Sequence, residues 1–137
     1  MPFTDDELAY LSTQRLGRLA TVQPDGTLQV SPVGFHYNPT TSTIDIQGYR
    51  MAASRKFRNV ADNGRVAFVV DDVPSVDPWR VRCVEIRGRG EAIDADAAQT
   101  QGLGGPTIRI HPRRIISFGL GAGDQDVHQM VSNARDV

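Results

Sequence analysis

The sequence contains few of the residues that would place it in several large classes of protein. It has a single cysteine, Cys83, in 137 residues, which excludes an internal disulfide and leads us to expect a reducing, cytoplasmic setting. No apolar run approaches the roughly 20 residues of a membrane-spanning helix, and the first residues carry no signal-peptide pattern. The formal net charge is −1 and the pI about 6.3, so no overall basic field attracts nucleic acid. We therefore expect neither a membrane nor a nucleic-acid partner.

Patterns typical of metal sites and of dinucleotide binding are also missing. The three histidines, His36, His111 and His128, do not combine with Cys83 in the spacing of a metal site, so we predict no metal. No nucleophile stands in a convincing pattern with a base that would activate it. The GLGAG run over 119–123 resembles part of a dinucleotide fingerprint, but only fourteen residues follow it, too few for the rest of a βαβ unit.

What is present is a succession of short strands separated by turn residues. Alternating apolar and polar residues predict strands, and Pro24-Asp25-Gly26 and Asn38-Pro39-Thr40 predict the turns that join the first three into an antiparallel meander. Glycines at 88 and 90 predict a bulge or sharp bend. The six expected strands cover residues 17–22, 28–37, 42–47, 65–70, 81–93 and 107–119, with a loop over 71–79. The sequence thus predicts a mainly β fold, a six-stranded antiparallel barrel in one domain over 1–137.

Two or three short helices accompany these strands. Thr4, followed three residues later by Glu7, fits a capping box at the start of the first helix. Ser54 is a good N-cap for a second helix that runs to Asn63, and Gly64 is a natural stop. A weaker helix followed by a glycine-rich loop covers residues 95–105. A polar tail covers residues 120–137.

Positively charged residues gather at the start of the second helix. Four of the fifteen basic residues, Arg50, Arg55, Lys56 and Arg58, fall within nine positions, and Lys56 is the only lysine. Cations at a helix N-terminus oppose the helix dipole and cost about 0.3–1 kcal/mol each. A phosphate would relieve that cost, because free N–H groups, the Ser54 hydroxyl and the cations all suit it. The alternative is a solvated basic turn with surface ion pairs.

Several motifs, taken in their serial order over about residues 4–120, resemble those of a known family. They are Gly17–Val22 (GRLATV), Ser31–Phe35 (SPVGF), Ser54–Lys56 (SRK) with Asn59 and Val60, Val84–Ala92 (VEIRGRGEA) and Ile110–Leu120 (IHPRRIISFGL). The family is the pyridoxamine 5'-phosphate oxidase-like superfamily of flavin- and deazaflavin-dependent proteins, whose fold is a six-stranded split β-barrel. The sequence looks closest to the branch that uses the deazaflavin coenzyme F420 and includes a reductase of tetracycline biosynthesis.

The resemblance implies an oxidoreductase that transfers a hydride between reduced F420 and a small organic acceptor. It also implies a homodimer with the cofactor in a cleft between the protomers. The residues implied to hold the cofactor phosphate are Arg50, Ser54, Arg55 and Lys56, with the backbone of Met51, Ala52 and Ala53. The ring is expected against the second strand, at Ser31, Pro32, Val33 and Gly34. Pro32 and Gly34 suit that role on their own terms, because neither places a bulky side chain in the way of a flat ring.

Three alternatives stay open at this point. An FMN-binding oxidoreductase of the same barrel fits equally, because FMN brings a phosphate to the same place. A flavin- or deazaflavin-binding protein without turnover also fits, as does a barrel retained only for dimerisation. The basic helix start does not distinguish FMN from F420.

Other residues have weaker predicted roles. His36 and Tyr37 are candidate proton donors, against a structural or surface role. Trp79 is a candidate wall over the substrate, against a plug of the barrel end or of a dimer interface. Arg113 and Arg114 are expected to be a solvated pair or an interface contact.

Overall fold

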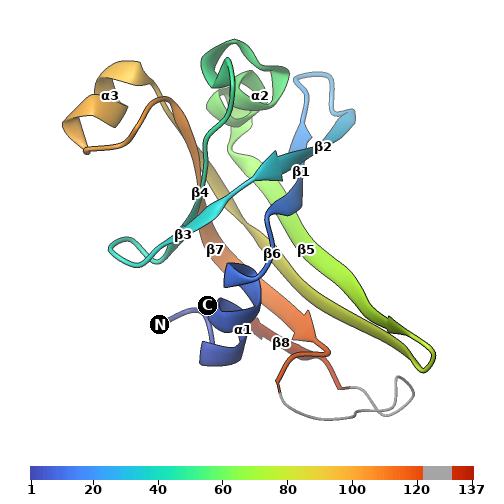
Figure 1. Ribbon diagram of the computed structural model, residues 1–137. Helices are drawn as coiled ribbons and strands as arrows, with labels where there is room; N and C mark the ends of the chain where they lie inside the picture. The colour runs from blue at the N-terminus through green and yellow to red at the C-terminus, as the bar shows by residue number, and fades with distance from the viewer. Residues whose placement is uncertain (122–130) are drawn as a thin grey trace.

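The fold is a sheet of eight strands with three α-helices and a short 3-10 helix, in the residues 1–121 and 131–137 that a computed structural model describes (Figure 1). The strands are β1 (Leu16–Val22), β2 (Leu28–Gly34), β3 (His36–Asn38), β4 (Thr43–Ile46), β5 (Arg65–Val76), β6 (Trp79–Ile93), β7 (Thr107–Phe118) and β8 (Asn133–Asp136). The helices are α1 (Asp5–Ser12), η1 (Met51–Ala53), α2 (Arg55–Asn63) and α3 (Ala95–Thr100). The predicted mainly β fold is therefore confirmed.

The two edges of the sheet belong to one extended stretch of chain. The strand order is β2-β1-β5-β6-β7-β4-β3, so β2 and β3 lie at opposite ends of the order although a single residue, Phe35, separates them in the sequence. Figure 1 shows this stretch crossing over the other strands. β2 pairs with β1 over its whole length, and β3 pairs with β4. The stretch thus closes the sheet into a half-open barrel.

A row of apolar side chains in register forms the centre of the core. Leu19 of β1 lies opposite Phe68 of β5, which lies opposite Ile86 of β6, which lies opposite Ile115 of β7. Each of the four is at most 1% exposed. Phe35 packs edge-on against Phe68, with ring centroids 5.3 Å apart. Because side chains alternate across a strand, the residues next to this row face outward.

The structure corrects three details of the predicted strands. The expected strand over 28–37 is divided at Phe35, so only its end, β3, forms the predicted hairpin with β4. The strand over 42–47 also pairs with β7, and β2 and β4 are not neighbours in the sheet. The expected loop over 71–79 is instead the end of β5 and the start of β6, joined by a two-residue turn. Its prolines do not break the ladder, because a register shift between Asp72 and Ser75 accommodates Pro74.

The predicted tail over 120–137 includes a strand. β8 pairs antiparallel with β7, with Ile115 opposite Arg135. Its sequence, NARD, is too short and polar to be recognised by alternation, so pairing with an existing edge decides its conformation. The part of the tail over 122–130 lies outside the described residues, as do His128 and the last two residues of the GLGAG run.

The helix and bulge predictions are confirmed. Thr4 and Glu7 form the capping box of α1, and Gly64 ends α2 in the left-handed region at φ 66°. The register of β6 and β7 shifts between Arg87 and Gly88. A Cβ on Gly88 would lie 2.2 Å from the carbonyl oxygen of His111, so only glycine permits the close approach of the two backbones there.

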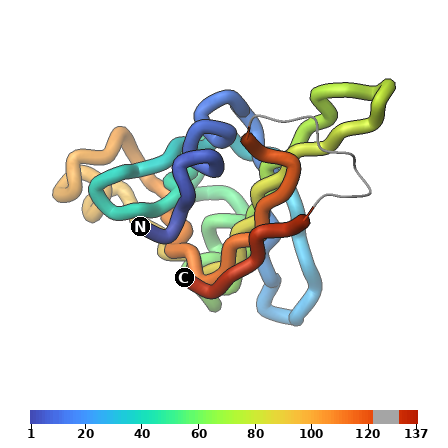
Figure 2. Tube along the Cα trace, turned by 90° about the horizontal axis from the view of Figure 1, so that it is seen from below, coloured from blue at the N-terminus to red at the C-terminus, as the bar shows by residue number. Residues whose placement is uncertain are grey.

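A buried carboxylate ties the two ends of the chain together. Glu7 of α1 is 0% exposed and accepts hydrogen bonds from Arg135 of β8 at 2.6 and 2.9 Å, from the Ser117 hydroxyl at 2.6 Å and from the Thr4 N–H at 2.9 Å. Arg135 also donates to the Pro2 carbonyl oxygen at 2.6 Å. The termini accordingly lie side by side in Figures 1 and 2. Burial alone raises the pKa of Glu7, but the bonds from these partners together hold it below its ordinary value of 4.5.

We expect Glu7→Gln to destabilise the protein by about 3 kcal/mol, because it leaves Arg135 with a neutral partner in a buried network. A carboxyl with a lowered folded pKa stabilises fully above about pH 4.5 and loses that contribution as the pH falls through the folded value. Urea unfolding between pH 7 and pH 3 should therefore show a steeper loss for the wild type than for Glu7→Gln. Asp136→Asn is the control. Asp136 follows Arg135 on β8, and its exposed ion pair with Arg114 should be worth under about 1 kcal/mol. Equal losses in the two variants would contradict the assignment.

Candidate functional site

The start of α2 is built by a capped helix end that carries no acidic residue. The Ser54 hydroxyl accepts the N–H of Phe57 at 3.2 Å and donates to the Met51 carbonyl oxygen at 2.6 Å. The first turn of α2 contains Arg55 and Lys56 instead of the carboxylates that a helix dipole favours. Ser54 therefore fixes the helix start, and the cations beside it do not contribute to helix stability.

The chain before this cap is held firmly by one apolar anchor. Met51 is 3% exposed and lies in the core, and the turns of η1 are closed by bonds from the Met51 N–H to Gly48 O and from the Ala53 N–H to Arg50 O. Arg50 adopts the left-handed region at φ 54°, which is uncommon for a residue other than glycine. Ala52 is exposed and small. A backbone conformation like that of Arg50 costs free energy and is common at ligand-binding sites.

The cations of this segment lack counter-ions among the described residues. Arg50 stacks over the exposed Tyr49 ring at 5.5 Å, but neither it nor Arg55 or Lys56 makes an ion pair within 4 Å there. Arg55 comes close enough to Asp25 to lower its pKa, although hydrogen bonds from Thr27 contribute more. The predicted alternative of a basic turn neutralised by surface ion pairs thus finds no pairs in the part of the chain that the structure describes.

The predicted ring-binding residues alternate between the two faces of β2. Val33 is buried and Ser31 half-buried on the core side, while Pro32 and Gly34 are exposed. A Cβ on Gly34 would meet nothing nearer than the Arg15 carbonyl oxygen at 3.9 Å, so packing within the chain does not demand glycine here. The buried Ser31 hydroxyl has no hydrogen-bond partner within the described chain. The open glycine on the exposed face of β2 is compatible with a ligand that approaches this face.

One buried side chain links β2 to α2. Asn59 is 0% exposed, and its amide donates to the Thr21 hydroxyl at 3.0 Å and to the Gln29 side-chain oxygen at 3.2 Å. The Asn59 Oδ1 has no partner within the described chain. Asn59 therefore links the middle of α2 to β1 and β2. The sequence motif includes this residue, but no role was assigned to it.

The candidate proton donors and the tryptophan occupy different environments. His36 is exposed at the start of β3, whereas the Tyr37 hydroxyl is buried without a partner and its ring packs edge-on against Phe3 at 5.5 Å. Trp79 is 50% exposed at the far end of the β5–β6 hairpin. Burial, with the charges of Asp71 and Glu85, raises the pKa of the Cys83 thiol to about 11, which makes it a poor nucleophile. No cluster of potential metal ligands occurs among the described residues, and no helix among them is long and apolar enough to cross a membrane.

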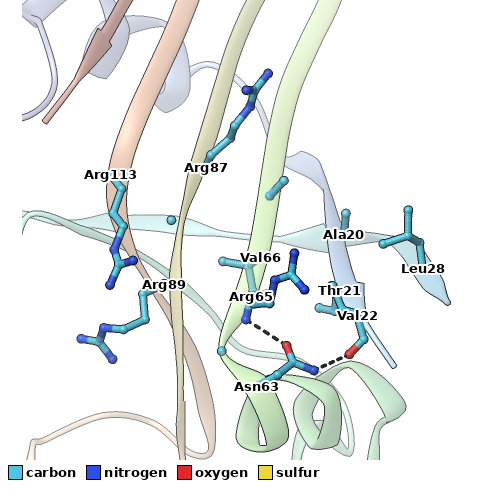
Figure 3. A pocket seen from close by; sticks show the side chains of 13 residues that line it. Ala20, Thr21, Val22, Leu28, Asn63, Arg65, Val66, Arg87, Arg89 and Arg113 are labelled. Atoms are coloured by element: carbon cyan, nitrogen blue, oxygen red, sulfur yellow. Dashed lines mark hydrogen bonds between the residues drawn. The ribbon is translucent and has the colours of Figure 1, made fainter. Parts of the chain in front are cut away.

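A second positively charged feature, absent from the predicted site, lies on the outer face of the sheet. A hollow of about 570 Å³ is bordered by the side chains of four arginines from β5, β6 and β7, together with the end of α2 (Figure 3). These residues are Arg65, Arg87, Arg89 and Arg113, which we call the arginine groove. The alternation of Arg87 and Arg89 on one strand predicts that those two share a face. The contributions of Arg65 and Arg113 depend on strand register, which the sequence does not contain.

Comparison with known proteins decides the family. The family model described as pyridoxamine 5'-phosphate oxidase matches residues 3–127. The chain belongs to that family. A curated relative, the 5a,11a-dehydrotetracycline/5a,11a-dehydrooxytetracycline reductase of Streptomyces rimosus, is 47% identical over 139 residues, which cover 100% of this chain and 94% of the relative. The family fold is that of flavin-binding oxidoreductases, and the chain is an oxidoreductase of this group.

Solved structures confirm the fold of this family member. A conserved hypothetical protein of Mycobacterium tuberculosis superposes with a TM-score of 0.65 at 21% identity, covering 84% of each chain. An FAD-binding protein of Mycobacterium smegmatis superposes with a TM-score of 0.60 at 23% identity, covering 84% of this chain and 93% of that one. At these identities the likeness establishes the split-barrel architecture and nothing about ligands.

The capping role of Ser54 is testable without any ligand. Ser54→Ala removes the acceptor of the Phe57 N–H and should lower the free energy of unfolding by about 1 kcal/mol in urea titrations followed by circular dichroism. Ser54→Thr keeps the hydroxyl and should retain most of the stability. The assignment fails if the two substitutions have the same effect.

Proposed function

We propose that the chain is an F420-dependent reductase that delivers a hydride to a small, conjugated organic acceptor. The observation that carries the proposal is the set of three cations, Arg50, Arg55 and Lys56, that surround a capped helix start without counter-ions among the described residues. The 47% identity with a dehydrotetracycline reductase supports an acceptor of the same general kind. We propose a cytoplasmic location, in keeping with the single free thiol of Cys83.

The residues present fit a phosphorylated tricyclic cofactor. Arg50, Arg55 and Lys56 supply positive charge, and the first N–H groups of α2 supply donors to a phosphate. The exposed face of β2 at Pro32 and Gly34 suits contact with a flat ring, whereas the Ser31 hydroxyl is buried on the opposite face. When bound, a reduced deazaflavin supplies the hydride, and the protein supplies position and electrostatics.

The tasks left to the chain are binding, orientation and the exclusion of water. A reacting pair must be held at roughly 3–3.5 Å, which favours a rigid wall such as β2, paired with β1 over seven residues. His36, exposed one residue beyond Phe35, is the candidate proton donor that is accessible, and solvent water is the alternative. The buried Tyr37 hydroxyl is less suited to that role, because it does not reach solvent in this chain.

We further propose that the functional unit is a homodimer. Leu28 and Val30 project from β2 with 77% and 67% of their surface exposed, and Val76 and Trp79 are 74% and 50% exposed at the end of the β5–β6 hairpin. Apolar side chains at this density on an exposed strand mark an association surface. A second copy of the chain would cover them and form the other wall of a cleft.

Two other functions remain to be separated from this one. An FMN-dependent oxidoreductase would use the same helix start, because both cofactors carry a phosphate. A binding protein without turnover would share the cofactor but not the acceptor chemistry. Absorbance of the purified protein separates the first alternative, because bound FMN gives peaks near ~450 nm and makes the protein yellow. Turnover of dehydrotetracycline with reduced F420 separates the second.

Charge reversal at the helix start tests the cofactor site. Arg55→Glu combined with Lys56→Glu should weaken F420 binding at least about 100-fold, because two charge-assisted contacts worth about 1.5–3 kcal/mol each become repulsive. The readout is quenching of F420 fluorescence, repeated with FMN. The matched control is Arg65→Glu with Arg89→Glu, two exposed arginines on β5 and β6 that also make no ion pair with a described residue. Unchanged affinity in the helix variant, with circular dichroism showing an intact fold, would remove the site assignment.

Sedimentation velocity tests the dimer. The wild type should sediment as a dimer at micromolar concentration, and Val30→Glu should shift it toward monomer, because a carboxylate would be buried at the interface. Val131→Glu, at another exposed valine, should leave the dimer intact. A monomeric wild type would contradict a cleft shared by two chains.

A further inference from the structure

The arginine groove concentrates positive charge on a protein that is not basic overall. Its four arginines come from three neighbouring strands, whereas the whole chain has a formal net charge of −1. Figure 3 shows the four side chains on β5, β6 and β7, with Arg87 and Arg89 extending in opposite directions from β6. The cluster is therefore a local feature made by the strand register and does not follow from composition.

The register places like charges directly against each other. Arg65 of β5 lies opposite Arg89 of β6, and Arg87 of β6 lies opposite Arg114 of β7. Like charges in directly opposed positions destabilise a sheet. The bulge opposite Gly88 inserts Arg113 into β7 and adds a further cation beside the same hollow. Repulsion between these arginines destabilises the isolated chain, whereas a bound anion would attract them and stabilise it.

Acidic neighbours neutralise only a part of this charge. Among the described residues Glu85 pairs with Arg87 at 2.7 Å, and Glu91 is bound to His111 at 2.9 Å. Arg65, Arg89 and Arg113 make no ion pair with a described residue. Three guanidinium groups are thus available, each with the planar donor fork that matches phosphate or carboxylate oxygens.

The floor of the groove is small and leaves room for a ligand. Ala20, Gly64, Ala67 and Gly88 line the hollow between the arginines, and it encloses about 570 Å³. The side chain of Asn63 closes one end, where its amide donates to the Val22 carbonyl oxygen at 2.7 Å. Small residues below long cationic ones make an open, shallow recess bordered by charged side chains.

We propose that the arginine groove binds a small anion that carries two or more phosphate or carboxylate groups, at a site distinct from the start of α2. Several negative groups suit the site, because its cations are spread over three neighbouring strands, with Arg65 on β5, Arg89 on β6 and Arg113 on β7. The site lies beside the C-terminal end of α2, whereas Arg55 and Lys56 lie at its N-terminal end. The proposal does not depend on which redox cofactor the protein uses.

The test is calorimetric titration of the Arg55→Glu, Lys56→Glu variant, whose helix start no longer attracts phosphate, with inorganic triphosphate and with citrate, at a fixed ionic strength set with sodium chloride. We expect saturable binding of one anion per chain. The probe that binds with the higher affinity shows whether the groove prefers phosphate or carboxylate groups. Arg65→Gln with Arg89→Gln should weaken binding about 100-fold, about tenfold for each guanidinium removed. Arg15→Gln, at an exposed arginine outside the groove, should leave the affinity unchanged.

Thermal unfolding supplies a second readout. The double variant should be at least as stable as the wild type, because it relieves a directly opposed like-charge pair, and triphosphate should raise the midpoint of the wild type only. Arg113→Gln, on the bulge, is a further variant that should lose about tenfold in affinity. The proposal is overturned if the variants bind as the wild type does, if neither probe binds, or if only long polyanions such as heparin or DNA bind.

The outcome is separable from that of the proposed function. Reversal of charge at Arg55 and Lys56 should leave triphosphate binding in the groove unchanged, while loss of Arg65 and Arg89 should leave the quenching of F420 fluorescence intact. Each site can thus fail without the other.

Discussion

The fold depends on one stretch of chain that serves both edges of the sheet. Residues 28–38 pair with β1 on one side and, after the break at Phe35, with β4 on the other, so the sheet closes without a second layer. Because the sheet closes on itself, the apolar row from Leu19 to Ile115 packs inside the barrel and needs no second sheet to cover it. Closure also leaves one face of β2, with Pro32 and Gly34, exposed.

Local signals in the sequence predict much of this architecture. The Thr4 capping box, the Ser54 cap and the Gly64 stop are decided by side chains within a few residues, and all three are present. The loop expected over 71–79 was wrong because prolines were read as breaks, although a register shift lets the hairpin continue past them. The pairing of β8 could not be predicted from a polar four-residue strand, because its conformation comes from the edge it joins.

The same distinction between local and distant information applies to the sites. The cations around the start of α2 are neighbours in sequence, so their meeting at one helix end is predictable, and their cofactor remains a proposal. The arginine groove combines Arg65, Arg89 and Arg113 from three strands, and only the register assembles it. Asn59 combines local and distant information. Its motif is visible in the sequence, but its hydrogen bond from α2 to Gln29 exists only in the folded chain. Helix α2 thus has a cationic feature at each end.

The bond between Arg135 and the buried Glu7 has a practical consequence for anyone who handles this protein. This bond fixes β8 against α1 and brings the two ends of the described chain close together. A short glycine-serine connector would join them into a closed ring, and new ends could then be opened in the exposed turn at Pro39 and Thr40. Conversely, an affinity tag that displaces Arg135 would expose a carboxylate built for the interior, so tags belong on spacers long enough to leave that strand in place.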